Sequence, residues 1–161
     1  MKTWKVENGD VALDVHGRIE EIGGSLKVVK DLKNWLVNDL GFNNFHPEMG
    51  SRLDNYVGQE VTARLLYDIR SEVRDILEKY MNTQMADLRK RIEERGDPMI
   101  AIGLAEPSSL VKSWTQLQVT QLKTGEIQIY IEFVTFTDDI EEVVLVVTSG
   151  IDSTYNLSRY G

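Results

Sequence analysis

The sequence predicts an α+β fold in which an N-terminal β-hairpin and two helices precede a C-terminal antiparallel sheet. Two hydrophobic periods, in separate parts of the chain, carry this prediction. Apolar residues recur every three or four positions between residues 25 and 95, and every second position from residue 114 onward. The first spacing places apolar side chains on one face of a helix, and the second places them on one face of a strand. Helices and strands that come in separate blocks are typical of an α+β protein.

Composition limits the classes of function. The 161 residues suffice for one domain with a real core, and 42% hydrophobic with 27% charged residues describe a folded globular chain. The net charge of −8 argues against nucleic-acid binding as the main role. No apolar run approaches the roughly 20 residues of a membrane span, and no secretion signal opens the chain. Without cysteine, a reducing cytoplasm is a suitable compartment. We expect no metal, no cofactor, no nucleic acid and no membrane contact.

The N-terminal hairpin is predicted around His16 and Gly17. Apolar residues alternate over 11–15, and the pattern resumes over 18–22 after this pair. A turn residue followed by glycine suits the positive φ of a tight hairpin. His16 is therefore interpreted as an exposed turn residue, because a metal role would need partners and the chain has only one other histidine.

A first helix is predicted over residues 26–40. Ser25 is placed to cap its start, and Gly41 is placed to end it. The chain then enters an elbow, FHPEMGSRLDNYVG, over residues 45–58.

Within the elbow, Pro47 fixes its own φ and pushes His46 toward an extended conformation. Gly50 and Gly58 allow left-handed turns. A short helical face lies between these glycines, formed by Leu53, Tyr56 and Val57. We interpret His46 as a structural turn residue rather than a catalytic base.

The longest segment without proline or glycine runs from Glu60 to Arg95. Its apolar stripe consists of Thr62, Leu66, Ile69, Val73, Ile76 and Tyr80, and continues on a neighbouring face through Leu77, Met81, Met85, Leu88 and Ile92. Unbroken, this helix would span about 54 Å, more than the ~40 Å diameter of a compact domain of this size. The slip of the stripe favours a break near Asn82 and Thr83, whereas the charged second half favours protrusion past the core. The run Gly96-Asp97-Pro98 is predicted to end it.

Three strands are predicted next, over residues 114–122, 126–136 and 142–148. A short loop with Gly125 joins the first two into an antiparallel hairpin with one buried face. The third strand is apolar on both faces at Val143, Val144, Leu145, Val146 and Val147. We expect it to be buried on both sides or covered by a partner. Residues 149–161 are predicted to be a polar, flexible tail.

Two motifs give the sequence a family resemblance. The elbow resembles the hP-x-x-G-x-x-L elbow of the baseplate wedge, or sheath-initiator, family of contractile phage tails. This family includes the TssE component of type VI secretion and was historically called lysozyme-like. The run GDVALDVHGRIEEIGG, residues 9–24, is similar to the family's N-terminal hairpin. Glu106 and Pro107 resemble the first two residues of the family's Glu-Pro-Arg docking motif, although Ser108 replaces the arginine; a plain loop is the alternative.

The resemblance implies a structural wedge subunit that nucleates sheath assembly in a virion tail baseplate or related injection machine. Such a subunit assembles in the host cytoplasm with other wedge subunits, the tail sheath protein, and tube or hub proteins. Family members look like truncated sheath subunits whose C-terminal sheet accepts strands from the first sheath ring. The implied docking sites are therefore Glu106–Pro107 and Val143–Val147. The alternative for the second site is an internal three-stranded sheet.

The sequence offers no active site of a known pattern. Its adjacent carboxylates lie on predicted strands, where neighbours point to opposite faces, or on charged helices. Glycoside hydrolysis needs two facing carboxyl groups, one of them in an apolar setting. Serine-hydrolase, P-loop and zinc-protease motifs are absent from the sequence. We expect a protein that is not an enzyme. The alternatives are a tail-associated peptidoglycan hydrolase and a stand-alone cytoplasmic adaptor.

Overall fold

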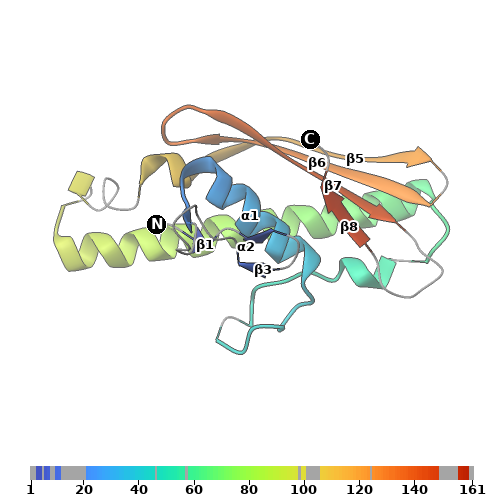
Figure 1. The fold of residues 1–161 in the computed structure, drawn as a ribbon, viewed down its shortest axis with the longest axis horizontal. Coiled ribbons are helices and arrows are strands. Elements are labelled where there is room, and N and C mark those ends of the chain that lie inside the picture. Colours follow the sequence, from blue (N-terminus) through green and yellow to red (C-terminus); the bar gives the residue numbers. More distant parts are fainter. Residues whose placement is uncertain are drawn as a thin grey trace.

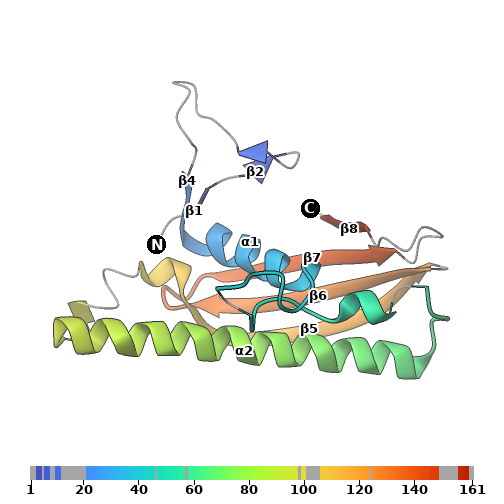
Figure 2. The ribbon, with the colours of Figure 1, turned by 90° about the horizontal axis from the view of Figure 1, so that it is seen from below.

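The computed structural model describes residues 3–4, 6–7, 10–11, 21–45, 47–56, 58–97, 99–100, 106–123, 125–148 and 156–159. Helices α1 (Gly24–Val37) and α2 (Ala63–Arg95) cover one face of an antiparallel sheet. The strands of this sheet are β5 (Val111–Lys123), β6 (Glu126–Thr135), β7 (Ile140–Thr148) and β8 (Asn156–Arg159), in the order β5-β6-β7-β8. α2 lies along β5, and α1 lies nearer β7 (Figures 1 and 2). The predicted α+β fold is confirmed.

Short antiparallel pairs form the described N-terminal part. β1 (Thr3–Trp4) pairs with β4 (Glu21–Ile22), and β2 (Val6–Glu7) pairs with β3 (Asp10–Val11). Val11 and Ile22, the two ends of the predicted hairpin, do not pair with each other. Val11 lies opposite Val6, and Ile22 lies opposite Thr3. The dipeptide Asn8-Gly9 separates β2 from β3 in the sequence and is itself a strong hairpin signal. His16, Gly17 and His46 lie outside the described residues.

α1 begins and ends earlier than the predicted 26–40. Gly23 is its N-cap, so Ser25 lies inside the helix, where its Oγ donates to Glu141 Oε1 of β7 over 2.9 Å instead of capping. The helix stops before Gly41 because Asn38 leaves the helical conformation. The carbonyl oxygen of Asn38 accepts the Ser51 N–H at 2.8 Å, and this hydrogen bond connects the end of α1 to the elbow.

The elbow is compact, as predicted. Its helical piece is η1 (Leu53–Tyr56), and Leu53 is buried. Gly50 and Gly58 have φ of 112° and 80°, in the left-handed region. Any other residue at Gly50 would place its Cβ 2.3 Å from the Asp39 carbonyl oxygen, so this close approach of the elbow to the residues after α1 requires glycine.

α2 is a single unbroken helix, so the break favoured near Asn82 and Thr83 does not occur. Its buried residues are Leu65, Ile69, Val73, Ile76, Leu77, Tyr80 and Leu88. A straight helix drifts about 20° per heptad, so an apolar stripe must move to a neighbouring face to stay against a core. Thr62 is the N-cap rather than a stripe residue, and Leu65 is buried in place of the half-buried Leu66.

The end of α2 is where the sequence predicts it. Gly96 takes φ 73° and caps the helix through a hydrogen bond to Ile92 O. The charged C-terminal part extends past the sheet (Figure 2). There Leu88 packs with Leu110 in a small cluster apart from the main core.

The main core lies between the helices and the inner face of the sheet. β6 alternates strictly, with Ile127, Ile129, Ile131 and Phe133 buried. A series of edge-to-face aromatic pairs, Trp35–Tyr80, Tyr80–Trp114 and Trp114–Phe133, joins α1, α2, β5 and β6. Each such pair contributes about 0.5–1.5 kcal/mol beyond the area it buries.

The sheet is larger than predicted. β5 and β7 begin earlier, at Val111 and Ile140, and β8 forms within the segment predicted to be a flexible tail. In β7, Val143, Leu145 and Val147 are buried against the helices, opposite Ile131, Ile129 and Ile127. Val146 points to the opposite face and is also buried, and Val144 is half-buried. Burial of the outer face is therefore complete at Val146 and partial at Val144, and cover by a partner stays a prediction.

Candidate functional site

Gln84 of α2 holds the start of β5. Its Nε2 donates to the Val111 carbonyl oxygen, and its Oε1 accepts the Val111 N–H, each at 2.8 Å. The amide side chain therefore satisfies both backbone groups of Val111, as a neighbouring strand would. Val111 is fully buried, so these groups have no water to bond. In the sequence Gln84 is only one more polar residue of a long helix, and nothing marks it as special.

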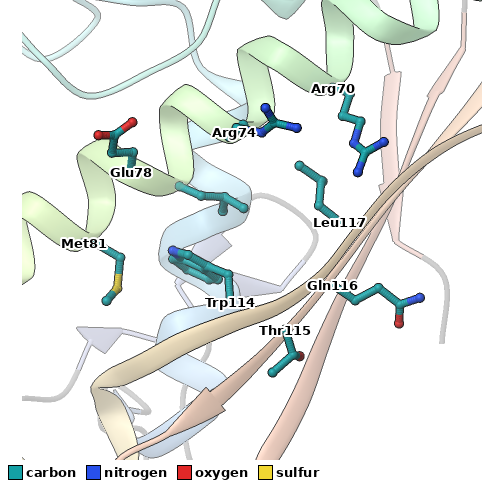
Figure 3. A pocket seen from close by; sticks show the side chains of 9 residues that line it. Arg70, Arg74, Glu78, Met81, Trp114, Thr115, Gln116 and Leu117 are labelled. Atoms are coloured by element: carbon teal, nitrogen blue, oxygen red, sulfur yellow. The ribbon is translucent and has the colours of Figure 1, made fainter.

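A groove of about 380 Å³ lies between α2 and β5 (Figure 3). Its lining residues are Arg70, Arg74, Leu77, Glu78 and Met81 from α2, and Trp114, Thr115, Gln116 and Leu117 from β5. Arg70 reaches from α2 toward β5, where Leu117 and Trp114 lie across the groove. The indole Nε1 of Trp114 is buried without a hydrogen-bond acceptor. In the sequence these arginines are ordinary charged residues of a long helix, and no local pattern singles them out.

The α2 wall of the groove carries two arginines that form no ion pair with the described residues. Arg70 and Arg74 lie one helical turn apart and are both exposed. Ion pairs in the described residues join Lys27 to Asp31, Arg91 to Asp87, Lys112 to Asp138 and Lys123 to Glu126. Neither groove arginine takes part in any of them. Two arginines without an ion-pair partner among the described residues therefore face the groove, and Glu78, one helical turn beyond Arg74, adds one opposing charge to the lining.

The outer face of the sheet carries a facing pair of carboxylates. Glu132 of β6 lies directly opposite Glu142 of β7. The Tyr130 hydroxyl lies 3.2 Å from Glu132 Oε2 and 3.1 Å from Glu142 Oε2, and its single proton can be donated to one of them at a time. Loss of hydration and the two acceptors raise the pKa of Tyr130 to about 12, so it stays protonated at neutral pH. Sequence reasoning missed this pair because it considered only adjacent carboxylates.

This carboxylate pair lacks the setting of a hydrolase site. It lies on the side of the sheet away from the helices, and Glu142 is exposed. Neither glutamate lines the α2–β5 groove or the second cavity described below. Thr115 Oγ1 also donates to Glu132 Oε1 at 2.8 Å, which holds that carboxylate in the surface network. A glycosidase instead places its acid in an apolar pocket beside the sugar.

A second cavity of about 250 Å³ lies where α1, the elbow, α2 and η2 (Pro107–Ser109) meet. Its walls carry charges of both signs, and Lys27 is paired with Asp31. Burial, with a smaller contribution from Asp31, raises the pKa of Tyr80 in this wall. In the described part of the chain, no group of three histidine, aspartate or glutamate side chains is arranged to hold a metal ion.

The predicted docking residues Glu106 and Pro107 form the start of η2, which packs on α1. Glu106 has φ 56°, an uncommon conformation for a residue other than glycine. Its carbonyl oxygen accepts the Ser109 N–H and the Ser109 Oγ–H, each at 2.8 Å. The backbone at this position is therefore held in one conformation. Val143–Val147 lie on a different element, β7, which also packs against α1.

The edges of the sheet are covered unequally. β8 pairs with the second half of β7, from Leu145 to Thr148. In the described residues, positions 140–144 of β7 pair with β6 alone, and β5 likewise pairs only with β6. An open strand edge exposes backbone groups that can bind another strand. Bulges near Ser113 and Gln116 interrupt the β5 edge, whereas the β6–β7 register has none.

The start of the elbow and the turn before it carry exposed aromatic side chains. Phe45 is 91% exposed and Phe42 is 48% exposed. The elbow projects from the helical layer on the side away from the sheet (Figure 1). A contiguous exposed apolar patch can mark a surface that contacts another protein, whereas single exposed apolar residues are common on folded proteins. None of the helices in the described residues is both long and apolar enough to cross a bilayer.

No protein-family model matches this chain, and no curated protein matches its sequence. Among solved structures, the chain is similar to the crystal structure of a Geobacter sulfurreducens protein provisionally named a tail lysozyme. The TM-score is 0.52 at 14% sequence identity, and the match covers 81% of this chain and 96% of that chain. At this identity the likeness shows a shared fold.

Proposed function

We propose that this chain is a structural baseplate wedge subunit that nucleates the sheath of a contractile phage tail or related injection machine. The observation that carries the proposal is the sheet, because the two helices cover one of its faces and positions 140–144 of β7 have no outer strand partner in the described residues. The exposed elbow and the fold shared with a protein provisionally named a tail lysozyme support it. The proposed location is the tail baseplate, with other wedge subunits, the sheath protein, and tube or hub proteins as partners.

Sheath docking is proposed along Val143–Val147. An incoming strand would pair with the open part of β7 at Val143 and Val144. To continue along Leu145, Val146 and Val147 it would take the place of β8, which is only four residues long. Exchanging a short strand of the same chain for a longer strand of a partner conserves backbone hydrogen bonds and adds new ones.

Docking onto a wedge neighbour is proposed at Glu106–Pro107. The test is assembly of purified components, with wedge formation and sheath polymerisation measured separately. We expect the protein to shorten the lag of sheath polymerisation. We also expect Glu106→Ala to weaken wedge formation by about 2–5 kcal/mol, because its partner's cation or amide would remain buried without a counterpart.

Two comparisons make this test specific. Glu94→Ala, an exposed glutamate near the end of α2, should leave assembly unchanged. Circular dichroism should show the same fold for both variants. Normal wedge formation with Glu106→Ala would mean that Glu106–Pro107 is an ordinary loop. If the unmodified protein leaves the lag of sheath polymerisation unchanged, the result would instead favour the stand-alone adaptor as its function.

We expect the purified protein not to hydrolyse peptidoglycan. The second candidate function, a tail lysozyme, is favoured only by the facing Glu132 and Glu142 and by the provisional name of the structural neighbour. The measurement is the turbidity of a cell-wall suspension. Turnover that disappears in Glu132→Gln or Glu142→Gln, but persists in Glu126→Gln, would overturn the structural proposal. Glu126 is a suitable control because it belongs to β6 and is paired with Lys123.

A further inference from the structure

We propose that the groove between α2 and β5 binds an extended, acidic segment of another protein. This site is separate from the β7 edge and goes beyond the sheath-nucleating role. The groove combines two unpaired arginines with an apolar end, and it runs beside a strand whose outer edge has no strand partner in the described residues. The occupant that fits this combination is a peptide segment carrying carboxylates and one apolar side chain.

The length of the groove sets the length of the segment. Its α2 wall extends from Arg70 to Met81. At about 1.5 Å per helical residue this wall is roughly 16 Å long. An extended chain rises about 3.3 Å per residue, so some five residues of a partner fit along it. A small anion would occupy only a fraction of this length.

The spacing of the charges sets the sequence pattern. Arg70 and Arg74 are neighbours on one helix face, about 6 Å apart along the axis. Alternate residues of an extended chain share one face and are separated by nearly the same distance, about 6.6 Å. Two carboxylates with one residue between them can therefore face both arginines at once. Guanidinium groups suit this role because they bind carboxylates with paired hydrogen bonds.

The far end of the groove selects against a third carboxylate. Beyond Arg74 the lining changes to Leu77, Glu78 and Met81, with Trp114 across the groove (Figure 3). A carboxylate in this position would meet Glu78, whereas an apolar side chain would contact Met81 and Trp114. The pattern that fits is acidic-x-acidic-x-apolar, read in either chain direction.

The test is the binding of short peptides with blocked termini to the full chain. Tryptophan fluorescence and calorimetry measure the affinity. The first probe is Asp-Thr-Asp-Thr-Leu, in which threonine favours an extended chain. The second probe replaces both aspartates by asparagine, and the third replaces the leucine by aspartate. We expect the first peptide to bind about tenfold more tightly than either of the others. We also expect its affinity to fall as salt is raised.

Variants locate the binding. The double variant Arg70→Gln/Arg74→Gln should weaken binding of the first peptide about tenfold and remove its preference over the asparagine peptide. Arg89→Gln/Arg95→Gln changes the same number of exposed α2 arginines outside the groove and should leave binding unchanged. Equal binding of all three peptides, no binding at all, or equal losses in both double variants would overturn the proposal. None of these results would affect the sheath assay, which does not involve the groove.

Discussion

Proline at one of two adjacent β7 positions should abolish sheath nucleation while the protein stays folded. In an antiparallel strand, successive backbone N–H groups point to opposite neighbours. Val143 and Val144 are adjacent and lie outside the stretch that pairs with the described residues of β8, so one N–H faces β6 and the other faces the side that has no described strand partner. Proline on the open side removes a donor that only an incoming strand would use. Proline on the β6 side breaks the sheet itself.

The measurement is the lag of sheath polymerisation, with circular dichroism as the test of folding. Val143→Ala and Val144→Ala are the matched controls, because they shorten the side chain but retain the N–H. They should preserve nucleation. If every proline that stops nucleation also unfolds the protein, this part of β7 is internal and the docking edge lies elsewhere. If prolines at Gln118 or Val119 in β5 stop nucleation instead, the docking edge is β5.

Gln84→Leu should destabilise the fold by about 2–4 kcal/mol. The substitution keeps the size of the side chain but removes both hydrogen bonds to Val111, which is fully buried. Each buried backbone group that loses its partner costs about 1–3 kcal/mol. The same contact positions the start of β5 against α2, so peptide binding in the α2–β5 groove should weaken as well.

Chemical denaturation measures this effect as a lower midpoint at an unchanged slope. Gln59→Leu is the matched control, because the Gln59 amide also donates to a backbone oxygen, Asn55 O at 2.7 Å, but in an exposed position. Its expected cost is below about 1 kcal/mol, since water can replace the lost partner. Equal losses in the two variants would show that the backbone groups of Val111 find other partners.

Local signals predicted the elements well where one residue type determines the backbone. Gly96 ends α2 and Gly50 turns the elbow, because both positions need a positive φ that glycine adopts without strain. The period-two pattern of β6 predicted its buried face residue by residue. Spacing failed where the local pattern was ambiguous. The stripe slip in α2 was compatible with a break or with a straight helix that drifts against its core, and only packing selected the straight helix.

For the candidate sites, the sequence identified chemistry on single segments, and the tertiary structure decided which segments meet. Glu106–Pro107 and Val143–Val147 could be named from the sequence because each is a continuous motif. The groove arginines, the facing Glu132 and Glu142, and the contact of Gln84 with Val111 could not be. Each joins residues from different elements. Strand register and helix placement, which depend on the burial of the whole core, bring these residues together, and no local spacing encodes that arrangement.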